Sequence, residues 1–314
     1  MANPILSVCI PTYNRADCLK KTLDSIVTSD VFLNTDNIEV VISNNCSTDN
    51  THELCLKYAN DHPGKIKYIN QETPVVIDIH IYKTIEYASG IYCKLNNDTC
   101  AFKENSLSDI VEYLKNNDVN AVFLHNQKTT KDYITVCKTY DEFINKVSYL
   151  STWIGSFCIK KSVFESFENP LRCNHLRLCQ IDLYGRLYEN GYPITVLEKE
   201  FFELNIPENK GKFANYNVAE VFGLNYFDIL TSYLGKNNGI QKSTIEKEKE
   251  NIIKFINDTY FDYNNSYAFN KTGYYKYMKK YFGSKLYFWT LYIKAEMKLS
   301  RKNLKRKIKA IFGK

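Results

Sequence analysis

The first half of the chain alternates short apolar runs with segments whose apolar residues recur at helical spacing, and this alternation constrains the fold most. The apolar runs expected to form strands are residues 5–10, 38–43, 66–70, 91–95 and 121–124. The segments expected to form helices are residues 16–27, 51–60, 78–89 and 103–116. Strands that alternate with helices of this length indicate βαβ units. We therefore predict an α/β fold with a mostly parallel sheet flanked by helices.

Polar loops follow three of the expected strands, at residues 11–15, 43–50 and 96–100. Ligands of open parallel sheets bind outside the carboxyl ends of the strands, so chemistry is expected in these loops. Asp98 and Thr99 offer hard oxygen ligands for a divalent cation, although Asn and Asp are also common in plain turns. The polar residues 47–49 equally suit a helix N-cap. Tyr13 and Arg15 suit a nucleotide base and a phosphate.

Several classes of protein are excluded by missing motifs. The chain has neither GxGxxG nor GxxxxGK[ST], which removes the simplest dinucleotide and P-loop sites. It also lacks HExxH and CxxC, so a zinc hydrolase is not expected. The 10 cysteines are scattered through apolar runs, as reduced core thiols are. Because we find no secretory signal and no apolar run of spanning length, we expect a cytoplasmic protein that does not cross a membrane.

Taken together, the loops resemble the nucleotide-sugar site of glycosyltransferase family 2, which has the GT-A fold. The resemblance covers residues 4–200, and its strongest stretches are residues 6–15 and 41–51. Residues 153–162 are similar to the acceptor-side segment of the family, and residues 182–192 to its catalytic helix. Within the family, the chain looks similar to bacterial O-antigen and capsule enzymes of the abequosyltransferase-like kind.

The resemblance implies a role for individual residues in donor binding. The residues expected to bind the nucleotide sugar are Pro11, Thr12, Tyr13, Arg15, Asn44, Asn96 and Asn97. Asp98 stands where the family binds Mn²⁺ or Mg²⁺, so a divalent metal is the expected cofactor. Asn44 and Asn96 stand where the family usually has carboxylates. One carboxylate with diphosphate oxygens can still hold such an ion, at weaker affinity.

The resemblance also implies an inverting transfer in which a carboxylate takes the proton of the acceptor hydroxyl. Asp182 is the expected base, and His175 is an alternative that could orient or replace it. The family often carries Glu-Asp two or three positions before this point, where the chain has Cys179 and Gln180. The expected acceptor is a lipid-linked saccharide of surface polysaccharide synthesis. Two alternatives stay open: a degenerate protein that binds nucleotide or saccharide without turnover, and a nucleotidyltransferase.

The positive charge of the chain is concentrated at its carboxyl end. Residues 271–314 contain 14 Lys or Arg and one acid, which leaves −7 for the remainder of a chain whose net charge is +6. Residues 285–312 are expected to form a basic amphipathic helix. We expect Lys285 to Lys314 to bind an anionic membrane on its cytoplasmic face. The alternatives are that the apolar stripe packs on the catalytic domain or, with least support, that the patch binds nucleic acid, which we do not expect.

These patterns also suggest how the chain is divided. Residues 1–207 are expected to form the catalytic domain, with the nucleotide-sugar half at residues 1–125 and the acceptor half at residues 126–207. Residues 208–314 are expected to form a helical region that ends in the basic helix.

Overall fold

A computed structural model describes residues 3–205, 216–261, 270, 272–284, 288–290, 293, 297 and 300. The chain packs into two compact units. The first unit consists of Met1–Glu208 and Tyr233–Ile240, and the second of Asn209–Ser232 and Gln241–Lys314. The chain therefore leaves the first unit, returns to it for eight residues, and leaves it again.

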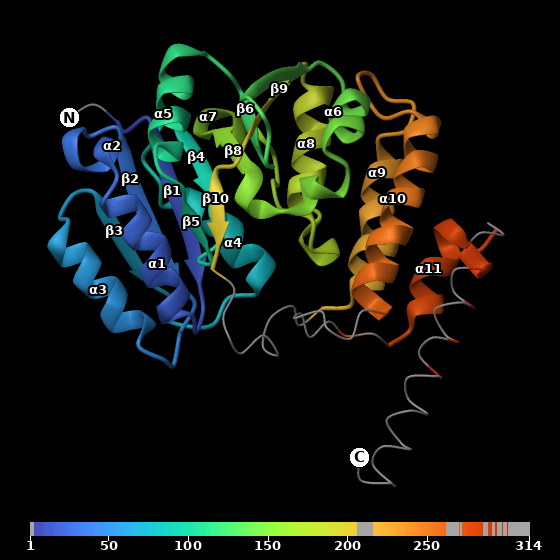
Figure 1. Cartoon of the computed structure of the whole chain (residues 1–314), viewed down its shortest axis with the longest axis horizontal. Helices are drawn as coiled ribbons and strands as arrows, with labels where there is room; N and C mark the ends of the chain where they lie inside the picture. The colour runs from blue at the N-terminus through green and yellow to red at the C-terminus, as the bar shows by residue number, and fades with distance from the viewer. Residues whose placement is uncertain are drawn as a thin grey trace, which may run out of the picture. The chain divides into compact units, whose positions relative to one another are not determined.

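One large sheet forms the centre of the first unit. Its strands are β1 (Leu6–Thr12), β2 (Ile38–Asn44), β3 (Ile66–Asn70), β4 (Tyr92–Leu95), β6 (Ala121–Asn126), β7 (Tyr133–Cys137), β8 (Phe157–Lys160) and β9 (Ile194–Lys199). They lie in the order β3-β2-β1-β4-β8-β6-β9-β7 (Figure 1). β3, β2, β1 and β4 are parallel. β8 and β7 are antiparallel to their neighbours, whereas β6 and β9 are parallel to each other. The predicted mostly parallel sheet is confirmed.

The central strands are buried on both faces. Leu6, Val8 and Ile10 of β1 pack in one apolar core cluster. Cys9, which points to the opposite face, is also fully buried. Burial on both faces explains why β1 reads as a continuous apolar run rather than as an alternation of apolar and polar residues.

Helices separate most of these strands along the chain. They are α1 (Ala16–Val27), α2 (Asp30–Asn34), α3 (Thr51–Asp61), α4 (Ile77–Glu86), α5 (Ser106–Asn116), α6 (Tyr140–Val147), α7 (Lys161–Ser166) and α8 (Cys179–Glu189), with short 3₁₀ helices η1 (Ser148–Thr152), η2 (Ile154–Ser156) and η3 (Asn174–Leu176). α1 has the bounds predicted from the sequence and buries Leu19, Leu23 and Ile26. It begins directly after the first polar loop, so its amino end lies at the carboxyl end of β1.

A second, two-stranded antiparallel sheet is formed by β5 (Cys100–Phe102) and β10 (Phe202–Leu204). Neither strand was predicted. The third polar loop was expected to extend to residue 100, but β5 already begins there. A strand of three residues is too short to give a periodic pattern, and here pairing with a distant strand defines it. The rings of Phe102 and Phe202 lie 5.1 Å apart across this sheet.

The described part of the second unit is helical, as expected for the region after residue 208. Its helices are η5 (Ala219–Asn225), which is a π-helix, α9 (Tyr226–Ser232), α10 (Lys242–Phe261) and α11 (Tyr274–Phe282). Lys280 Nζ and Tyr281 OH of α11 donate to Asp228 Oδ1 of α9, at 2.6 and 2.5 Å. Most of the basic helix expected at residues 285–312 lies outside the described residues. Among the residues that are described, no helix has both the length and the apolar character needed to span a membrane.

Candidate active site

The three predicted loops lie together at the carboxyl ends of β1, β2 and β4. Thr12 and Asn44, the last residues of β1 and β2, are paired in register. The N–H of Asn45 donates to the carbonyl of Thr12 across 3.0 Å. On the other side of β1, the N–H of Asn96 donates to the carbonyl of Cys9 across 2.8 Å. The strand order therefore gathers all three loops at one edge of the sheet.

The first loop is tied to the second by Asn14. This residue has a φ of 51°, in the left-handed region that Asn tolerates better than most residues. Its N–H donates to Ser47 Oγ across 2.9 Å, and its Oδ1 accepts from the N–H of Thr48 across 2.6 Å. Pro11 lies within β1, while the neighbouring Tyr13 side chain is 52% exposed. The loop thus has a fixed backbone and presents an aromatic ring to solvent.

The carboxylate of Asp49 serves the amino ends of two helices. Its Oδ2 accepts from the N–H of Ala16, the first residue of α1, across 3.2 Å. Its Oδ1 accepts from the N–H of Thr51, the first residue of α3, across 3.1 Å. Asp49 thus bonds the first N–H of each helix, although the N-cap residue of α3 is Asn50 and makes no side-chain capping bond.

Asp98 is the carboxylate at the centre of this edge. Its Oδ2 accepts from Thr12 Oγ1 across 2.9 Å, and its Oδ1 lies 2.8 Å from Arg15 NH1. Its carbonyl accepts from Thr22 Oγ1 of α1 across 2.9 Å. Burial raises the pKa of Asp98, while Arg15 and Thr12 act in the opposite direction. The sequence prediction placed Thr12, Arg15 and Asp98 in one site, and the structure brings them into direct contact.

Asn96 faces inward, toward a buried lysine. Its Oδ1 accepts from Lys94 Nζ across 2.7 Å, and its Nδ2 donates to the carbonyls of Asn97 and Cys100. Lys94 is fully buried and also donates to the carbonyl of Gly155 across 3.0 Å. Burial lowers the pKa of Lys94 to about 7. Asn96 therefore shapes the third loop from beneath.

Lys94 was not singled out from the sequence. Its Nζ lies 5.2 and 4.5 Å from the ring centroids of Phe102 and Phe202, within cation–π range. A lysine within an apolar strand was the available signal, since Lys is rarely fully buried. The rings that surround it belong to β5 and β10, which the sequence pattern did not reveal.

Asn44 also has its hydrogen-bonding groups occupied within the protein. Its Nδ2 donates to Tyr68 OH and to Asn70 Oδ1, at 3.1 and 3.0 Å. Its Oδ1 accepts from the N–H of Ser47 across 3.1 Å. The side chain is 1% exposed. In this structure Asn44 holds the second loop in shape.

The oxygen atoms near Asp98 suit a hard cation that arrives with other ligands. They include the Asp98 carboxylate and the Thr12 hydroxyl. Asn97 Oδ1 is buried and has no hydrogen-bond partner within the described part of the chain. Among the described residues, no group of three or more His, Cys, Asp or Glu could hold a metal. Mg²⁺ is commonly held by one or two carboxylates and substrate phosphates, so the residues present fit a cation that a diphosphate helps to bind.

Asp182 lies inside α8 and is bonded by two other residues. Arg172 Nε and NH2 donate to its two carboxylate oxygens at 2.8 and 2.7 Å, and Tyr233 OH donates to Oδ1 at 2.6 Å. The Asp182 side chain is 2% exposed. Burial raises the pKa of Tyr233, with Asp182 acting in the same direction, so this hydroxyl remains a donor. Arg172 and Tyr233 were missed because they lie 10 and 51 positions from Asp182.

The two positions where the family often has Glu-Asp are also buried. Cys179 is a buried free thiol. Gln180 Oε1 accepts from Tyr82 OH of α4 across 2.7 Å. One turn before Tyr82, Asp78 lies 3.5 Å from Arg177, and burial raises the pKa of Asp78. Asp78 is a second acidic side chain near the amino end of α8 that sequence reasoning did not select.

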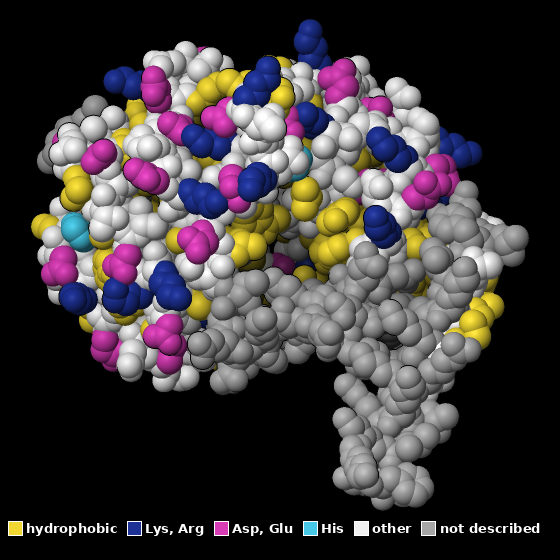
Figure 2. Space-filling view, in the orientation of Figure 1, with side chains coloured by type: hydrophobic (Ala, Val, Ile, Leu, Met, Phe, Trp, Pro, Cys, Tyr) yellow, Lys and Arg dark blue, Asp and Glu magenta, His cyan; other side chains and the backbone are white. Residues whose placement is uncertain are grey.

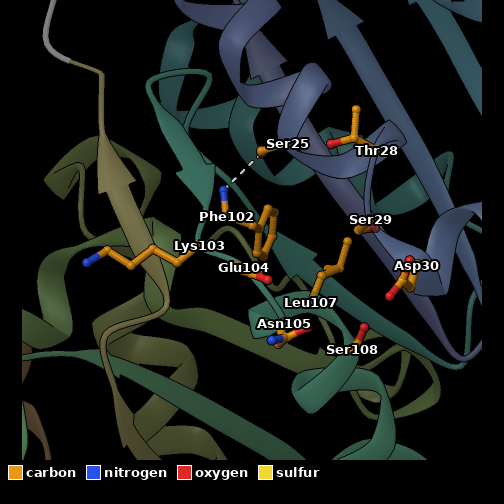
Figure 3. Close-up of a pocket in the computed structure, with 10 residues that line it drawn as sticks. All are labelled: Ser25, Thr28, Ser29, Asp30, Phe102, Lys103, Glu104, Asn105, Leu107 and Ser108. Atoms are coloured by element: carbon orange, nitrogen blue, oxygen red, sulfur yellow. Dashed lines mark hydrogen bonds between the residues drawn. The ribbon is translucent and has the colours of Figure 1, made fainter.

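A cavity of about 300 Å³ lies apart from these loops (Figure 3). It is lined by the end of α1, the start of α2 and residues 102–108. Figure 3 shows the bond in which Phe102 N–H donates to Ser25 Oγ, at 2.9 Å. None of the predicted site residues lines this cavity. The chemistry is therefore assigned to the strand-end loops and not to the cavity.

Comparison with known proteins identifies the family. The family model described as glycosyl transferase family 2 matches residues 7–184, a span that includes every predicted site residue. Abequosyltransferase RfbV of Salmonella typhimurium strain LT2 is 34% identical over 110 residues. That alignment covers 35% of this chain and 32% of RfbV, so the chain spans about a third of this relative.

Solved structures share the fold at low sequence identity. Residues 1–349 of TarS from S. aureus match with a TM-score of 0.54 and 18% identity, over 92% of this chain and 78% of that one. The mannosyltransferase PcManGT from Pyrobaculum calidifontis, in complex with GDP-Man and Mn²⁺, matches with a TM-score of 0.55 and 14% identity. This second match covers 82% of this chain and 76% of that one. The predicted GT-A fold is confirmed.

Proposed function

Because the chain belongs to glycosyl transferase family 2, we propose that it transfers a sugar from a nucleotide-diphosphate sugar to a saccharide acceptor. The observation that carries this proposal is the convergence of three strand-end loops on one buried carboxylate, Asp98. Crevices at the carboxyl ends of parallel strands are where open α/β sheets bind their ligands. A cationic guanidinium, an exposed aromatic ring and a carboxylate at one such crevice suit the parts of a nucleotide sugar.

The first loop would hold the nucleotide. Tyr13 is exposed and offers a ring on which a base can stack. Arg15 would bind the diphosphate, because a guanidinium pairs with phosphate oxygens through two parallel bonds. Asn96 and Asn97 would contribute to donor binding from the third loop. Asn44 and Pro11 would contribute from the ends of β2 and β1.

Asp98 would hold the divalent cation, Mn²⁺ or Mg²⁺. Such an ion supplies positive charge to the diphosphate as it leaves. Thr12 orients the carboxylate by donating to Oδ2. The proposal fits PcManGT, which was solved with GDP-Man and Mn²⁺.

We propose that transfer inverts the configuration of the anomeric carbon. A carboxylate of the protein would take the proton of the acceptor hydroxyl. Attack from the face opposite the leaving diphosphate gives inversion in one step. Asp182 stays the predicted base. Because Arg172 and Tyr233 occupy its two oxygens, Asp182 would have to release one of these donors before it could accept a proton. Asp78, which lies 3.5 Å from Arg177, is the carboxylate against which this role should be compared.

The proposed acceptor is a lipid-linked saccharide of bacterial O-antigen or capsule synthesis. The similarity to abequosyltransferase RfbV supports the transfer of a sugar. We propose that Lys285 to Lys314 bind the anionic inner face of the cell membrane, with about 1 kcal/mol from each cation near the surface. On the face shown in Figure 2, acidic and basic side chains of the described residues intermingle.

A donor screen tests the proposed activity. The full chain is incubated with UDP-, GDP-, CDP- and dTDP-sugars and Mn²⁺, and nucleotide release is measured. We expect release from one nucleotide class, with Asp98→Ala at background. Nucleotide binding without release would favour the degenerate alternative, which the internally bonded Asn44 and Asn96 motivate. Pyrophosphate release from a nucleoside triphosphate would indicate a nucleotidyltransferase.

Liposome flotation tests the membrane proposal separately. The full chain is compared with a chain ending at Gly283, on vesicles with and without anionic lipid. We expect flotation of the full chain only with anionic vesicles, and loss of flotation on truncation. Equal flotation of both chains would refute a membrane role for Lys285 to Lys314.

A further inference from the structure

Arg15 is bonded to the carboxylate of Asp98, which the proposed cation would need as a ligand. Its NH1 lies 2.8 Å from Asp98 Oδ1, while Thr12 Oγ1 donates to Oδ2 across 2.9 Å. The Asp98 side chain is only 3% exposed. Both carboxylate oxygens are therefore bonded by donors of the chain itself.

Only the side chain of Arg15 needs to move to uncover Asp98. The backbone N–H of Arg15 donates to Thr51 Oγ1 across 3.3 Å, and α1 begins at the next residue, Ala16. The backbone is thereby attached to the start of α3 and to α1. The Arg15 side chain is 29% exposed, and rotation about its own bonds can change its partner.

A nucleotide diphosphate offers the guanidinium an equivalent partner. Arginine binds phosphate and carboxylate with the same paired geometry, so the exchange keeps its charge neutralised. A divalent cation that arrives without a diphosphate gives the guanidinium no new partner. The carboxylate is already paired, and the guanidinium repels a second positive charge placed a few ångströms away.

We propose that Arg15 couples cation binding to donor binding. It holds Asp98 in the free protein and moves to the diphosphate when nucleotide and cation bind together. The choice of ligands rests on the proposed function. In this coupling Arg15 acts by setting the availability of Asp98. By linkage, the nucleotide must then raise the affinity for the cation by the same factor as the cation raises the affinity for the nucleotide.

Titration calorimetry on the full chain tests this coupling. MnCl₂ and UDP are titrated separately, and each is then titrated in the presence of the other; GDP, CDP and dTDP replace UDP where UDP does not bind. In the wild-type chain we expect weak Mn²⁺ binding that the nucleotide strengthens by about 10-fold or more. In Arg15→Gln we expect Mn²⁺ alone to bind about 10-fold more tightly. The coupling factor should fall by about the same factor but stay above one, because diphosphate oxygens still help to hold the cation.

Lys20→Gln is the matched control. It also removes one positive charge from the amino-terminal half of α1, but Lys20 is exposed and pairs with Asp24. We expect its Mn²⁺ and nucleotide titrations to match those of the wild-type chain. Circular dichroism melting establishes that each variant folds, and Arg15→Met is the replacement if Arg15→Gln does not.

Unchanged Mn²⁺ affinity and unchanged coupling in Arg15→Gln would overturn the inference. This outcome differs from failure of the proposed function. If the wild-type chain binds none of the four nucleotides, the proposed function fails, whereas the titration with Mn²⁺ alone still reports whether Arg15 competes for Asp98.

Discussion

Two buried aspartates of this protein have the same kinds of partner but differ in how firmly they are held. Asp98 bonds one nitrogen of Arg15 and the hydroxyl of Thr12. Asp182 bonds two nitrogens of Arg172 and the hydroxyl of Tyr233. A single contact to a loop arginine can be exchanged for a ligand, whereas a fork with two bonds fixes geometry. The comparison indicates that Asp98 is placed to change partners and Asp182 to hold two segments together.

The largest expected effect is on turnover when Asp98 is removed. Asp98→Ala eliminates the carboxylate proposed to hold the cation, and we expect nucleotide release to fall by about 10²–10³-fold. Arg15 is partly exposed and can be solvated once the Asp98 carboxylate is gone, so the protein should still fold. Nucleotide release at saturating donor and Mn²⁺ measures the effect, with circular dichroism as the control for folding. Full turnover would remove Asp98 from the site.

Asp182→Asn tests the other member of the comparison. Loss of the charge leaves Arg172 without its ionic partner. We expect the free energy of unfolding to fall by about 2 kcal/mol, less than for a fully buried pair because the Arg172 side chain is 44% exposed. If Asp182 is the base, as predicted, turnover per folded molecule also falls by about 10²-fold or more.

Urea denaturation and nucleotide release, measured on the same preparations, separate these two effects of Asp182→Asn. Asp78→Asn is the paired variant. Loss of stability with normal turnover in Asp182→Asn, together with lost turnover in Asp78→Asn, would assign the proton to Asp78.

Lys94, the buried lysine bonded to Asn96 of the third loop, should make the stability of the protein depend on pH. The pKa of Lys94 is lowered to about 7 by burial, so between pH 7 and its unfolded pKa the unfolded chain binds more protons than the folded one. Stability should therefore rise with pH from about 7 to 8.5, by at most about 1.4 kcal/mol per unit. Urea denaturation of the wild-type chain and Lys94→Met should show this rise only in the former. Equal slopes would show that Lys94 does not titrate in this range.

The smallest effect is expected from Tyr233→Phe. This change removes the hydroxyl that donates to the carboxylate and carbonyl of Asp182 and accepts from Arg172 NH2. The two bonds from Arg172 to the Asp182 carboxylate stay in place. We expect a loss of about 1 kcal/mol in the free energy of unfolding, with nucleotide binding unchanged. A weakened nucleotide affinity would mean that Tyr233 also influences the donor loops, and the contrast between the two aspartates would then be smaller.

Helices and strands could be predicted where the local spacing of apolar residues defines them. The predicted bounds of residues 16–27 and 66–70 agree with α1 and β3 because apolar spacing and polar ends define both segments. The position of the loops followed from strand order, since parallel strands end at the same edge. The contacts of Asp182 were not predictable, because Arg172 and Tyr233 reach it through tertiary packing. The roles given to single site residues remain predictions until the variants are measured.

The return of Tyr233–Ile240 to the first unit limits how this protein can be divided or recombined. A shortened chain that ends at Glu208 would contain the whole span matched by the family, yet it would lack the hydroxyl that bonds Asp182. The backbone of this segment is also used, since Asn238 and Gly239 carbonyls accept from the first two residues of α6. Exchange of catalytic units between relatives would therefore have to include this distant segment to preserve α8.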